Sequence, residues 1–289
     1  MQRRTFLGLL GCLAAGVRAG DGRPPIRIGL TPVILDDRVA FLRRWAHWLE
    51  ARLDQPVAFV QRAKYQDIME LLSSDQLDAA WICGYPYVRH LDSLDLLAVP
   101  VYQGRPLYRS YIITRADNQK AQGMQDLARG VFAFSDPLSN SGYLYPVYRL
   151  HQLFPHLPQP QRRLFRRTFF TWGHRHVIEA VGVGLADAGA VDGYVWDQLA
   201  RLHPELTART RIVERSPEFG FPPLVAPHHL ETERRERLAQ VLGHMHEEPQ
   251  GRRLLASLGL DRFAFRTPSL YAGIALMASS VADERSQDS

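Results

Sequence analysis

The sequence predicts an α/β fold of two lobes joined by a hinge. Strand-like and helix-like segments alternate along most of the chain, which is typical of α/β proteins. The alternation breaks twice, at 96–114 and at 211–227, because one extended segment follows another with no helix between them. Two such crossings predict an outer lobe of residues 25–107 plus 220–280, an inserted lobe of residues 108–215, and a hinge between them.

The outer lobe begins with three strands at 26–30, 57–61 and 79–82. A helix follows the first strand, where Asp36 or Asp37 is the candidate N-cap and the apolar residues recur at helical spacing. These residues are Val39, Phe41, Leu42, Trp45, Trp48 and Leu49. A second helix is expected at 66–73. The strand at 79–82 is apolar throughout, so we expect it to be buried on both faces.

The inserted lobe repeats the pattern from residue 131. We expect strands at 131–134, 165–171 and 188–191, with helices beginning at Ser141, after the second strand and at Tyr194. Beyond the return crossing, the chain from Glu231 is mainly helical and includes an apolar helix around 273–277. Residues 281–289 are mostly polar and terminal, which predicts a disordered tail.

The first 19 residues have the pattern of an export signal. Arg3 and Arg4 precede an apolar run at 6–17 that is too short to cross a membrane, and small residues flank Arg18. This pattern resembles a twin-arginine signal and predicts export to the periplasm. Cys12 also ends a segment that resembles a lipoprotein cleavage site. Few apolar residues precede it, so we rank lipid anchoring second.

Charge and cysteine content exclude several classes of protein. The chain has 35 Lys and Arg against 30 Asp and Glu, and removal of residues 1–19 leaves 32 against 30, or +2. There is no run of like charges that would predict a nucleic-acid partner. Cys83 is the only cysteine after residue 19, so no internal disulfide forms, and no Cys/His cluster has zinc spacing. We expect neither a metal nor a cofactor.

Three turns, each between a strand and a helix, are candidates for a binding site. The first contains Ser139, Asn140 and Ser141. Their hydroxyl and amide groups lie beside the free N–H groups of a helix start, where the helix dipole favours an anion. Such a turn holds a tetrahedral oxyanion without a lysine. The alternative is a plain N-cap, in which Ser139 or Ser141 only satisfies the helix.

The second turn follows the buried strand and contains Cys83, with Tyr85 and Tyr87 able to close over a ligand. Ligands of open α/β sheets bind at such carboxyl ends of strands. The alternative is that the tyrosines only pack at a lobe surface. The third candidate pairs His174 with Asp192, at turns that would face the same cleft. A lone histidine is more often structural, so that alternative also stays open.

Nothing in the sequence supports an enzyme. The motifs Gly-x-Ser-x-Gly, His-Glu-x-x-His and Gly-x-x-x-x-Gly-Lys are absent. A triad of Ser141, His174 and Asp192 would need a strained turn at the serine, and a serine at an ordinary helix start does not provide it. We therefore expect a binding protein and no catalytic residues.

Together these segments resemble the phosphate/phosphite/phosphonate-binding proteins of ABC transporters. The matching elements, in chain order, are Gly29 to Pro32, Tyr65, Asp78 to Trp81, Asp136 to Tyr143, and His174 placed ten residues before Gly184 to Ala190. The resemblance spans nearly all of the chain after the signal. It implies a type II periplasmic-binding-protein fold and a monomer that closes around a small oxyanion.

The resemblance also implies which residues contact the ligand. Ser139, Asn140 and Ser141 would hold its oxygens at the helix start. Tyr65 and Tyr87 would contribute from the outer lobe, and His174 and Asp192 from the inserted lobe. Asp192 would accept a hydrogen bond from a protonated ligand oxygen, as in a hydrogen phosphonate, whereas a dianion would be repelled.

Two residues depart from the family pattern. Asn140 stands where the family often has threonine, and Cys83-Gly84 stands where the family usually has Gly-Pro. A thiol at a helix start is expected to have a lowered pKa and raised reactivity. This predicts a thiophilic ligand, such as arsenite, bound by Cys83. The alternative is a small buried apolar residue.

These observations predict a solute-binding protein that delivers an oxyanion to the permease of an ABC transporter. A membrane sensor kinase is the alternative partner, because either partner needs only to prefer the closed form.

Overall fold

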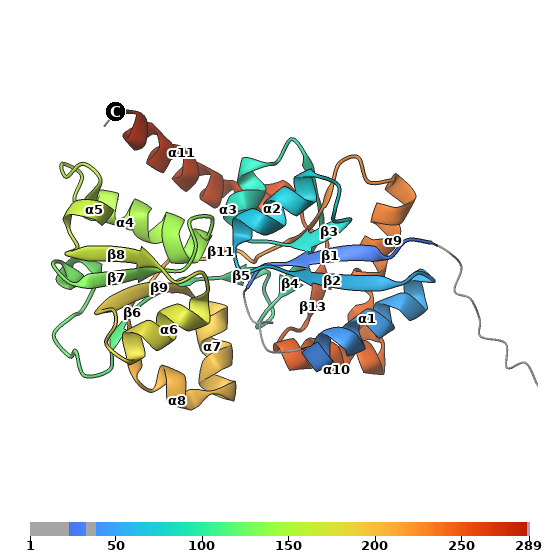
Figure 1. Cartoon of the computed structure of the whole chain (residues 1–289), viewed down its shortest axis with the longest axis horizontal. Helices are drawn as coiled ribbons and strands as arrows, with labels where there is room; N and C mark the ends of the chain where they lie inside the picture. The colour runs from blue at the N-terminus through green and yellow to red at the C-terminus, as the bar shows by residue number, and fades with distance from the viewer. Residues whose placement is uncertain (1–22, 33–38, 288–289) are drawn as a thin grey trace, which may run out of the picture.

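The computed structural model describes residues 23–32 and 39–287. The predicted export signal at 1–19, Cys12, and the candidate caps Asp36 and Asp37 lie outside these residues. Within them the chain forms two α/β lobes, each built on its own sheet (Figure 1). The predicted α/β class with a two-segment hinge is confirmed.

The first sheet has six strands in the order β13-β4-β12-β3-β1-β2. Its strands are β1 (Ile26–Leu30), β2 (Val57–Gln61), β3 (Ala79–Trp81), β4 (Leu94–Val101), β12 (Leu224–Pro227) and β13 (Arg262–Ala264). β1 pairs parallel with both β2 and β3, and β12 pairs antiparallel with β3 and β4. The helices of this lobe are α1 (Val39–Leu53), α2 (Tyr65–Ser73), α3 (Gly84–Arg89), α9 (Thr232–Gly243), the short η3 (Met245–Glu247) and α10 (Pro249–Leu258).

The core of this lobe is centred on Trp45 of α1, which is 1% exposed. Its ring centroid lies 4.9 Å from that of Phe59, 6.2 Å from that of Trp81 and 6.3 Å from that of Phe263. These partners come from β2, β3 and β13. The apolar residues of α1 recur at helical spacing, so they form one face of the helix, and that face packs on the sheet. The helix predicted from this spacing is confirmed.

The second sheet has five strands in the order β10-β6-β9-β7-β8. Its strands are β6 (Ser110–Arg115), β7 (Val131–Phe134), β8 (Arg167–Phe170), β9 (Ala188–Asp192) and β10 (Thr210–Arg215). β7 is parallel to both β8 and β9. The helical segments of this lobe are η1 (Met124–Leu127), η2 (Asn140–Leu144), α4 (Tyr145–Leu153), α5 (Pro160–Arg163), α6 (His174–Gly182), α7 (Gly193–Leu202) and α8 (Pro204–Thr207). Because β7 runs parallel to both β8 and β9, the turns that follow all three strands lie at the same edge of the sheet.

Two short strands link the lobes. β5 (Leu107–Tyr108) and β11 (Phe219–Gly220) pair antiparallel in a separate two-stranded sheet. The chain leaves the six-stranded sheet after β4 and returns to it at β12, and Figure 1 shows β5 and β11 between the two lobes.

The C-terminal helix α11 (Ala272–Gln287) follows the short η4 (Pro268–Tyr271) and contacts both lobes. It packs against α3 of the first lobe and against α4 and η2 of the second. The predicted disordered tail from residue 281 is wrong as far as Gln287, because the helix continues to that residue. Val281 is buried on the same face as Ile274 and Met277, so packing extends the helix beyond its apolar centre. No helix among the described residues is long and apolar enough to cross a membrane.

Candidate functional site

The turn after β7 leads through η2 into α4, and its residues Ser139, Asn140 and Ser141 are buried. Leu144 N–H donates to Ser139 O at 2.9 Å, and Tyr145 N–H donates to Asn140 O, so the first turn is a wide π-turn that continues into α4. Such turns are common at functional sites. Ser139 Oγ accepts from Gly142 N–H at 2.9 Å, so Ser139 is the N-cap of the helix.

The front of this helix faces the other lobe. Asn140 N–H donates to Cys83 Sγ at 3.2 Å, and Asn140 Nδ2 donates to the hydroxyl of Tyr108 at 3.0 Å. Cys83 lies between β3 and α3, and Tyr108 lies on the hinge strand β5. Asn140 is 0% exposed. The turn is therefore enclosed between the two lobes and the hinge.

Three side-chain oxygens of this turn are buried without a hydrogen-bond partner among the described residues. They are Ser135 Oγ, Asn140 Oδ1 and Ser141 Oγ. Buried polar atoms in native proteins nearly always have partners, and an exception needs a physical explanation. Three such atoms lie within seven residues at the junction of the two lobes, so this turn is the candidate site.

His174 connects the two lobes through its two ring nitrogens. Its Nδ1 accepts from Asp192 N–H at 3.0 Å, and its Nε2 lies 3.2 Å from the hydroxyl of Tyr65. Because Nδ1 accepts, the ring proton is on Nε2, which donates to Tyr65. Burial lowers the pKa of His174 to about 3, so the ring is neutral at physiological pH.

Asp192 ends β9 and caps α7. Its Oδ1 accepts from Tyr194 N–H at 2.9 Å and from Val195 N–H at 3.4 Å. Burial raises the pKa of Asp192 to about 7, against the opposite effect of these two hydrogen bonds. Burial is the main cause of the raised pKa values of Cys83 and Tyr108, and the negative charge of Asp192 contributes to both rises.

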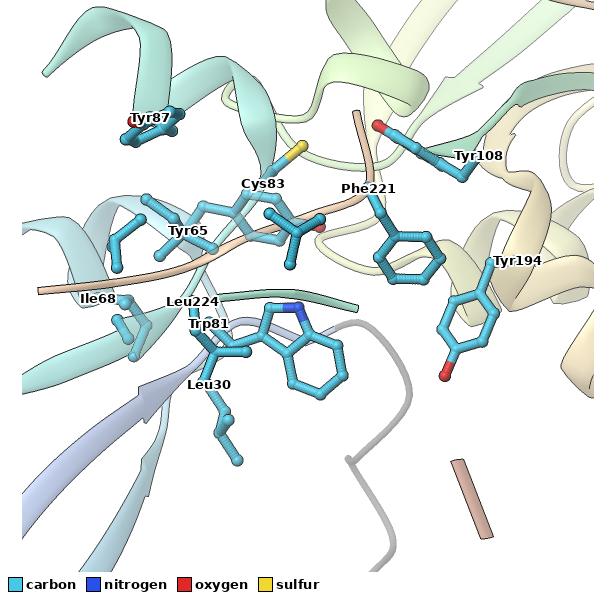
Figure 2. Close-up of a cluster of buried hydrophobic side chains, with 14 of the residues drawn as sticks. Leu30, Tyr65, Ile68, Trp81, Cys83, Tyr87, Tyr108, Tyr194, Phe221 and Leu224 are labelled. Carbon is cyan, nitrogen blue, oxygen red and sulfur yellow. The ribbon is translucent and has the colours of Figure 1, made fainter. Parts of the chain in front are cut away.

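Cys83 is buried beside the turn, and Figure 2 shows its sulfur directed toward the hydroxyl of Tyr108. The expectation of a lowered thiol pKa is wrong. Burial raises the pKa of Cys83 to about 11, although the N–H groups of Asn140 and Tyr85 act in the opposite direction. α3 has only six residues, and the loss of solvation outweighs the effect of its N-terminus.

Tyr87 does not join the cluster. Its ring packs edge-to-face on Tyr271 at 5.0 Å, and in Figure 2 it lies on the side of Cys83 away from Tyr108. Burial, and to a smaller degree the negative charge of Asp95 of β4, raise the pKa of Tyr87.

Two residues at this place were not expected from the sequence. Tyr108 is 4% exposed and holds the amide of Asn140, and Ser135 supplies one of the unpartnered oxygens. The sequence around Tyr108 does not identify it as a site residue, because the hinge strand β5 meets the turn only in the folded chain. Among the described residues no group of three or more His, Cys, Asp or Glu could hold a metal ion.

The two hinged lobes, with a polar turn enclosed between them, define a two-lobed solute-binding protein. Solved structures share this fold. A binding protein of an ABC phosphonate transporter from Pseudomonas aeruginosa superposes with a TM-score of 0.80 at 21% identity, over 88% of this chain and 85% of that one. PhnD1 of Prochlorococcus marinus in complex with methylphosphonate superposes with a TM-score of 0.75 at 20% identity, over 89% of this chain and 98% of that one. Both comparisons show the type II periplasmic-binding-protein fold.

The sequence identifies the family. Residues 28–271 match the model of the periplasmic substrate-binding proteins of phosphonate ABC transporters, and the chain belongs to this family. The phosphate-import protein PhnD of Mycolicibacterium smegmatis is 30% identical over 148 residues. That alignment covers 49% of this chain and 46% of the relative, so the match spans less than half the length of that protein.

Proposed function

We propose that this protein binds a small oxyanion of the phosphonate, phosphite or phosphate class between its lobes and delivers it to an ABC transporter permease. The observation that carries this proposal is the turn of residues 135–141, enclosed at the lobe junction with three unpartnered oxygens. Membership of the phosphonate-binding family supports the same class of ligand. In this role the chain binds its ligand without converting it.

The ligand is held by neutral groups. Ser139, Asn140 and Ser141 contribute from the helix start, where the dipole favours an anion. Tyr65 and His174 contribute from opposite lobes, and we add Tyr108 and Ser135 to the set. A neutral imidazole and hydroxyl groups suit a monoanion better than a dianion, because they stabilise an oxygen by hydrogen bonding without a full positive charge.

Asp192 completes this assignment as an acceptor for a protonated ligand oxygen. With a pKa raised to about 7, the carboxyl is partly protonated near neutral pH and tolerates a bound anion. An ionised Asp192 would repel a dianion. We therefore propose the singly protonated form of the ligand as the bound species.

Delivery follows from closure of the lobes. The hydrogen bonds Tyr65–His174 and Asn140–Cys83 both cross between the lobes, so they exist only in the closed form. A ligand that bridges the same groups shifts the protein toward this form, and a permease needs only to prefer it. We further propose a monomer in the periplasm, exported by the twin-arginine signal at 1–19, with lipid anchoring at Cys12 as the second choice.

Calorimetry tests this function directly. The protein without residues 1–19 is titrated with methylphosphonate, phosphite and phosphate, and with sulfate, which carries no proton at neutral pH. We expect binding of at least one of the first three and none of sulfate. Ser141→Ala should weaken that binding by about 1–3 kcal/mol. Equal affinity of the variant and the unchanged protein for the bound oxyanion would contradict the site.

Cys83 supports a second candidate, an arsenite-binding protein that acts on a membrane sensor kinase. Its sulfur lies within the same polar cluster, at 3.2 Å from Asn140 N. Arsenous acid forms a sulfur–arsenic bond with a thiol, and the displaced hydroxide leaves as water with the thiol proton, so a protonated Cys83 is competent. Titration with arsenite, compared between the unchanged protein and Cys83→Ser, tests this candidate. Equal affinities would remove it.

A further inference from the structure

Asp136 connects the two lobes through a helix N-terminus. It follows Ser135 in the buried turn and is 1% exposed. Its Oδ1 accepts from Leu138 N–H at 2.8 Å, within the turn. Its Oδ2 accepts from Tyr65 N–H at 3.1 Å, and Tyr65 is the first residue of α2 in the other lobe.

α2 has no cap of its own. Lys64 occupies the N-cap position in an extended conformation, and its side chain makes no capping hydrogen bond. The first N–H groups of a helix need acceptors from outside the helix, and a carboxylate there also interacts favourably with the helix dipole. Asp136 supplies that acceptor across the lobe junction. The helix is therefore capped only while the lobes are closed.

This cap acts on a residue of the proposed binding site. The N–H of Tyr65 is held by Asp136, and its hydroxyl is held by His174 at 3.2 Å. Both partners belong to the inserted lobe, whereas Tyr65 belongs to the outer lobe. Asp136 thus fixes the backbone from which the Tyr65 side chain projects.

A second contact joins the same segments closer to the surface. Lys64 Nζ lies 4.8 Å from the ring centroid of Trp172, which precedes His174 by two residues. Trp172 has a φ of 63°, a left-handed conformation that costs a tryptophan about 1–2 kcal/mol. Its N–H donates to Ser135 O at 2.7 Å, which holds it in this conformation. Trp172 is 37% exposed.

We infer that Asp136 is a positioning residue which, together with the Lys64–Trp172 contact, latches the closed form and sets the rate of ligand release without touching the ligand. The part that concerns release rests on the proposed function. Lys64 contacts the ring of Trp172 and also acts on Asp136. Burial raises the pKa of Asp136, and the positive charge of Lys64 opposes that rise. The latch forms after the ligand has been met, so it affects dissociation rather than association.

Asp136→Asn is a selective test. An asparagine has one acceptor oxygen, so it keeps the bond to Leu138 in the turn and presents an NH₂ group to the N–H of Tyr65. The matched control is Asp187→Asn, because Asp187 Oδ2 accepts from Val131 N–H at 2.7 Å within the inserted lobe alone. Stopped-flow fluorescence with methylphosphonate, phosphite and phosphate gives the rates. A third variant, Lys64→Met, removes the charge and retains the length.

We expect Asp136→Asn to dissociate about tenfold faster than the unchanged protein, as loss of a hydrogen bond to a charged group implies. Lys64→Met should dissociate about threefold faster. Association should change less than about twofold in both, and Asp187→Asn should match the unchanged protein in both rates. Equal dissociation from Asp136→Asn and Asp187→Asn would overturn the latch.

If none of the three oxyanions binds the unchanged protein, the proposed function fails and the latch is decided by amide exchange. In the ligand-free protein, Tyr65 N–H should then exchange faster in Asp136→Asn than in Asp187→Asn. Equal exchange at Tyr65 in the two variants would overturn the latch independently of any ligand.

Discussion

The imidazole of His174 links the main chain of Asp192 to the side chain of Tyr65 through its two nitrogens. Nδ1 accepts from Asp192 N–H at 3.0 Å within the inserted lobe, and Nε2 donates to the hydroxyl of Tyr65 of the other lobe over 3.2 Å. The first bond fixes the tautomer that makes the second possible. A neutral histidine therefore aligns the two lobes.

The two bonds of His174 can be separated by substitution. His174→Asn retains an acceptor near the position of Nδ1 and loses the reach to Tyr65, whereas His174→Ala loses both. We expect both variants to bind the oxyanion less tightly, by about 1–2 kcal/mol. Only His174→Ala should also lower the free energy of unfolding, because it leaves Asp192 N–H buried and unpaired. Urea unfolding and calorimetry measure the two effects, and equal destabilisation by both variants would contradict this account.

Ser139 and Ser141 should respond differently to replacement by alanine. Ser139 Oγ caps the helix through Gly142 N–H, so Ser139→Ala should lower the free energy of unfolding by about 1 kcal/mol. Ser141 Oγ has no partner among the described residues, so Ser141→Ala should leave the stability of the ligand-free protein unchanged or higher. Urea denaturation without ligand compares the two variants. A larger loss for Ser141→Ala than for Ser139→Ala would show that its hydroxyl has a structural partner.

Asp192 should make the protein less stable as the pH rises. Its pKa is about 7 in the folded chain and about 3.9 when unfolded, so between these values the folded state keeps a proton that the unfolded state releases. Stability from this group therefore falls from about pH 4 to about pH 7. His174, with a folded pKa of about 3 against about 6.5 unfolded, has the opposite trend between about pH 3 and pH 6.5.

Asp192→Asn isolates the first of these effects. Asparagine keeps the capping oxygen for Tyr194 and Val195 but does not ionise. We expect the variant to gain stability over the unchanged protein as the pH is raised from 5 to 8, with the contribution of His174 common to both. Urea unfolding at several pH values measures the difference. A difference that does not vary with pH would mean that Asp192 is ionised throughout.

Cys83 should be unreactive in the folded protein. A thiol with a pKa of about 11 is almost entirely protonated at pH 8, and the thiolate is the reactive form. In a Cys12→Ser background, we expect alkylation by iodoacetamide at pH 8 to be at least about 100-fold slower than that of free cysteine. Addition of urea should restore the ordinary rate. Rapid alkylation of the folded protein would show that the lobes open often enough to expose the thiol.

Local pattern predicted the turns well because each turn is a local structure. Polar residues after an apolar strand and before a helical pattern have one common arrangement, and 139–141 adopt it. The same pattern could not distinguish the cap from the ligand group. Ser139 proves to be the cap and Ser141 the unpartnered residue, because the π-turn sets which hydroxyl reaches an N–H.

Contacts between residues far apart in the chain could not be predicted from local sequence patterns. Tyr108 enters the cluster from the hinge, and Asp136 meets Tyr65 across 71 positions. Tyr87 was expected to contact the ligand from the outer lobe, and its ring packs on Tyr271, a residue of a helical segment near the C-terminus. Such contacts depend on how the lobes dock, which periodicity and capping do not encode.

Alternation of short-range patterns was sufficient to specify an α/β chain with two crossings, because strands, helices and turns each have a periodicity or a capping residue that can be read locally. The family motif added the helix start as the place for an oxyanion. Folding then established the protonation states and the pairing across the junction. Burial raised the pKa of Cys83 and lowered that of His174. Docking of the two lobes brought Asp136 to the N-terminus of α2, where it accepts from Tyr65 N–H. Each of these effects depends on enclosure by the opposite lobe.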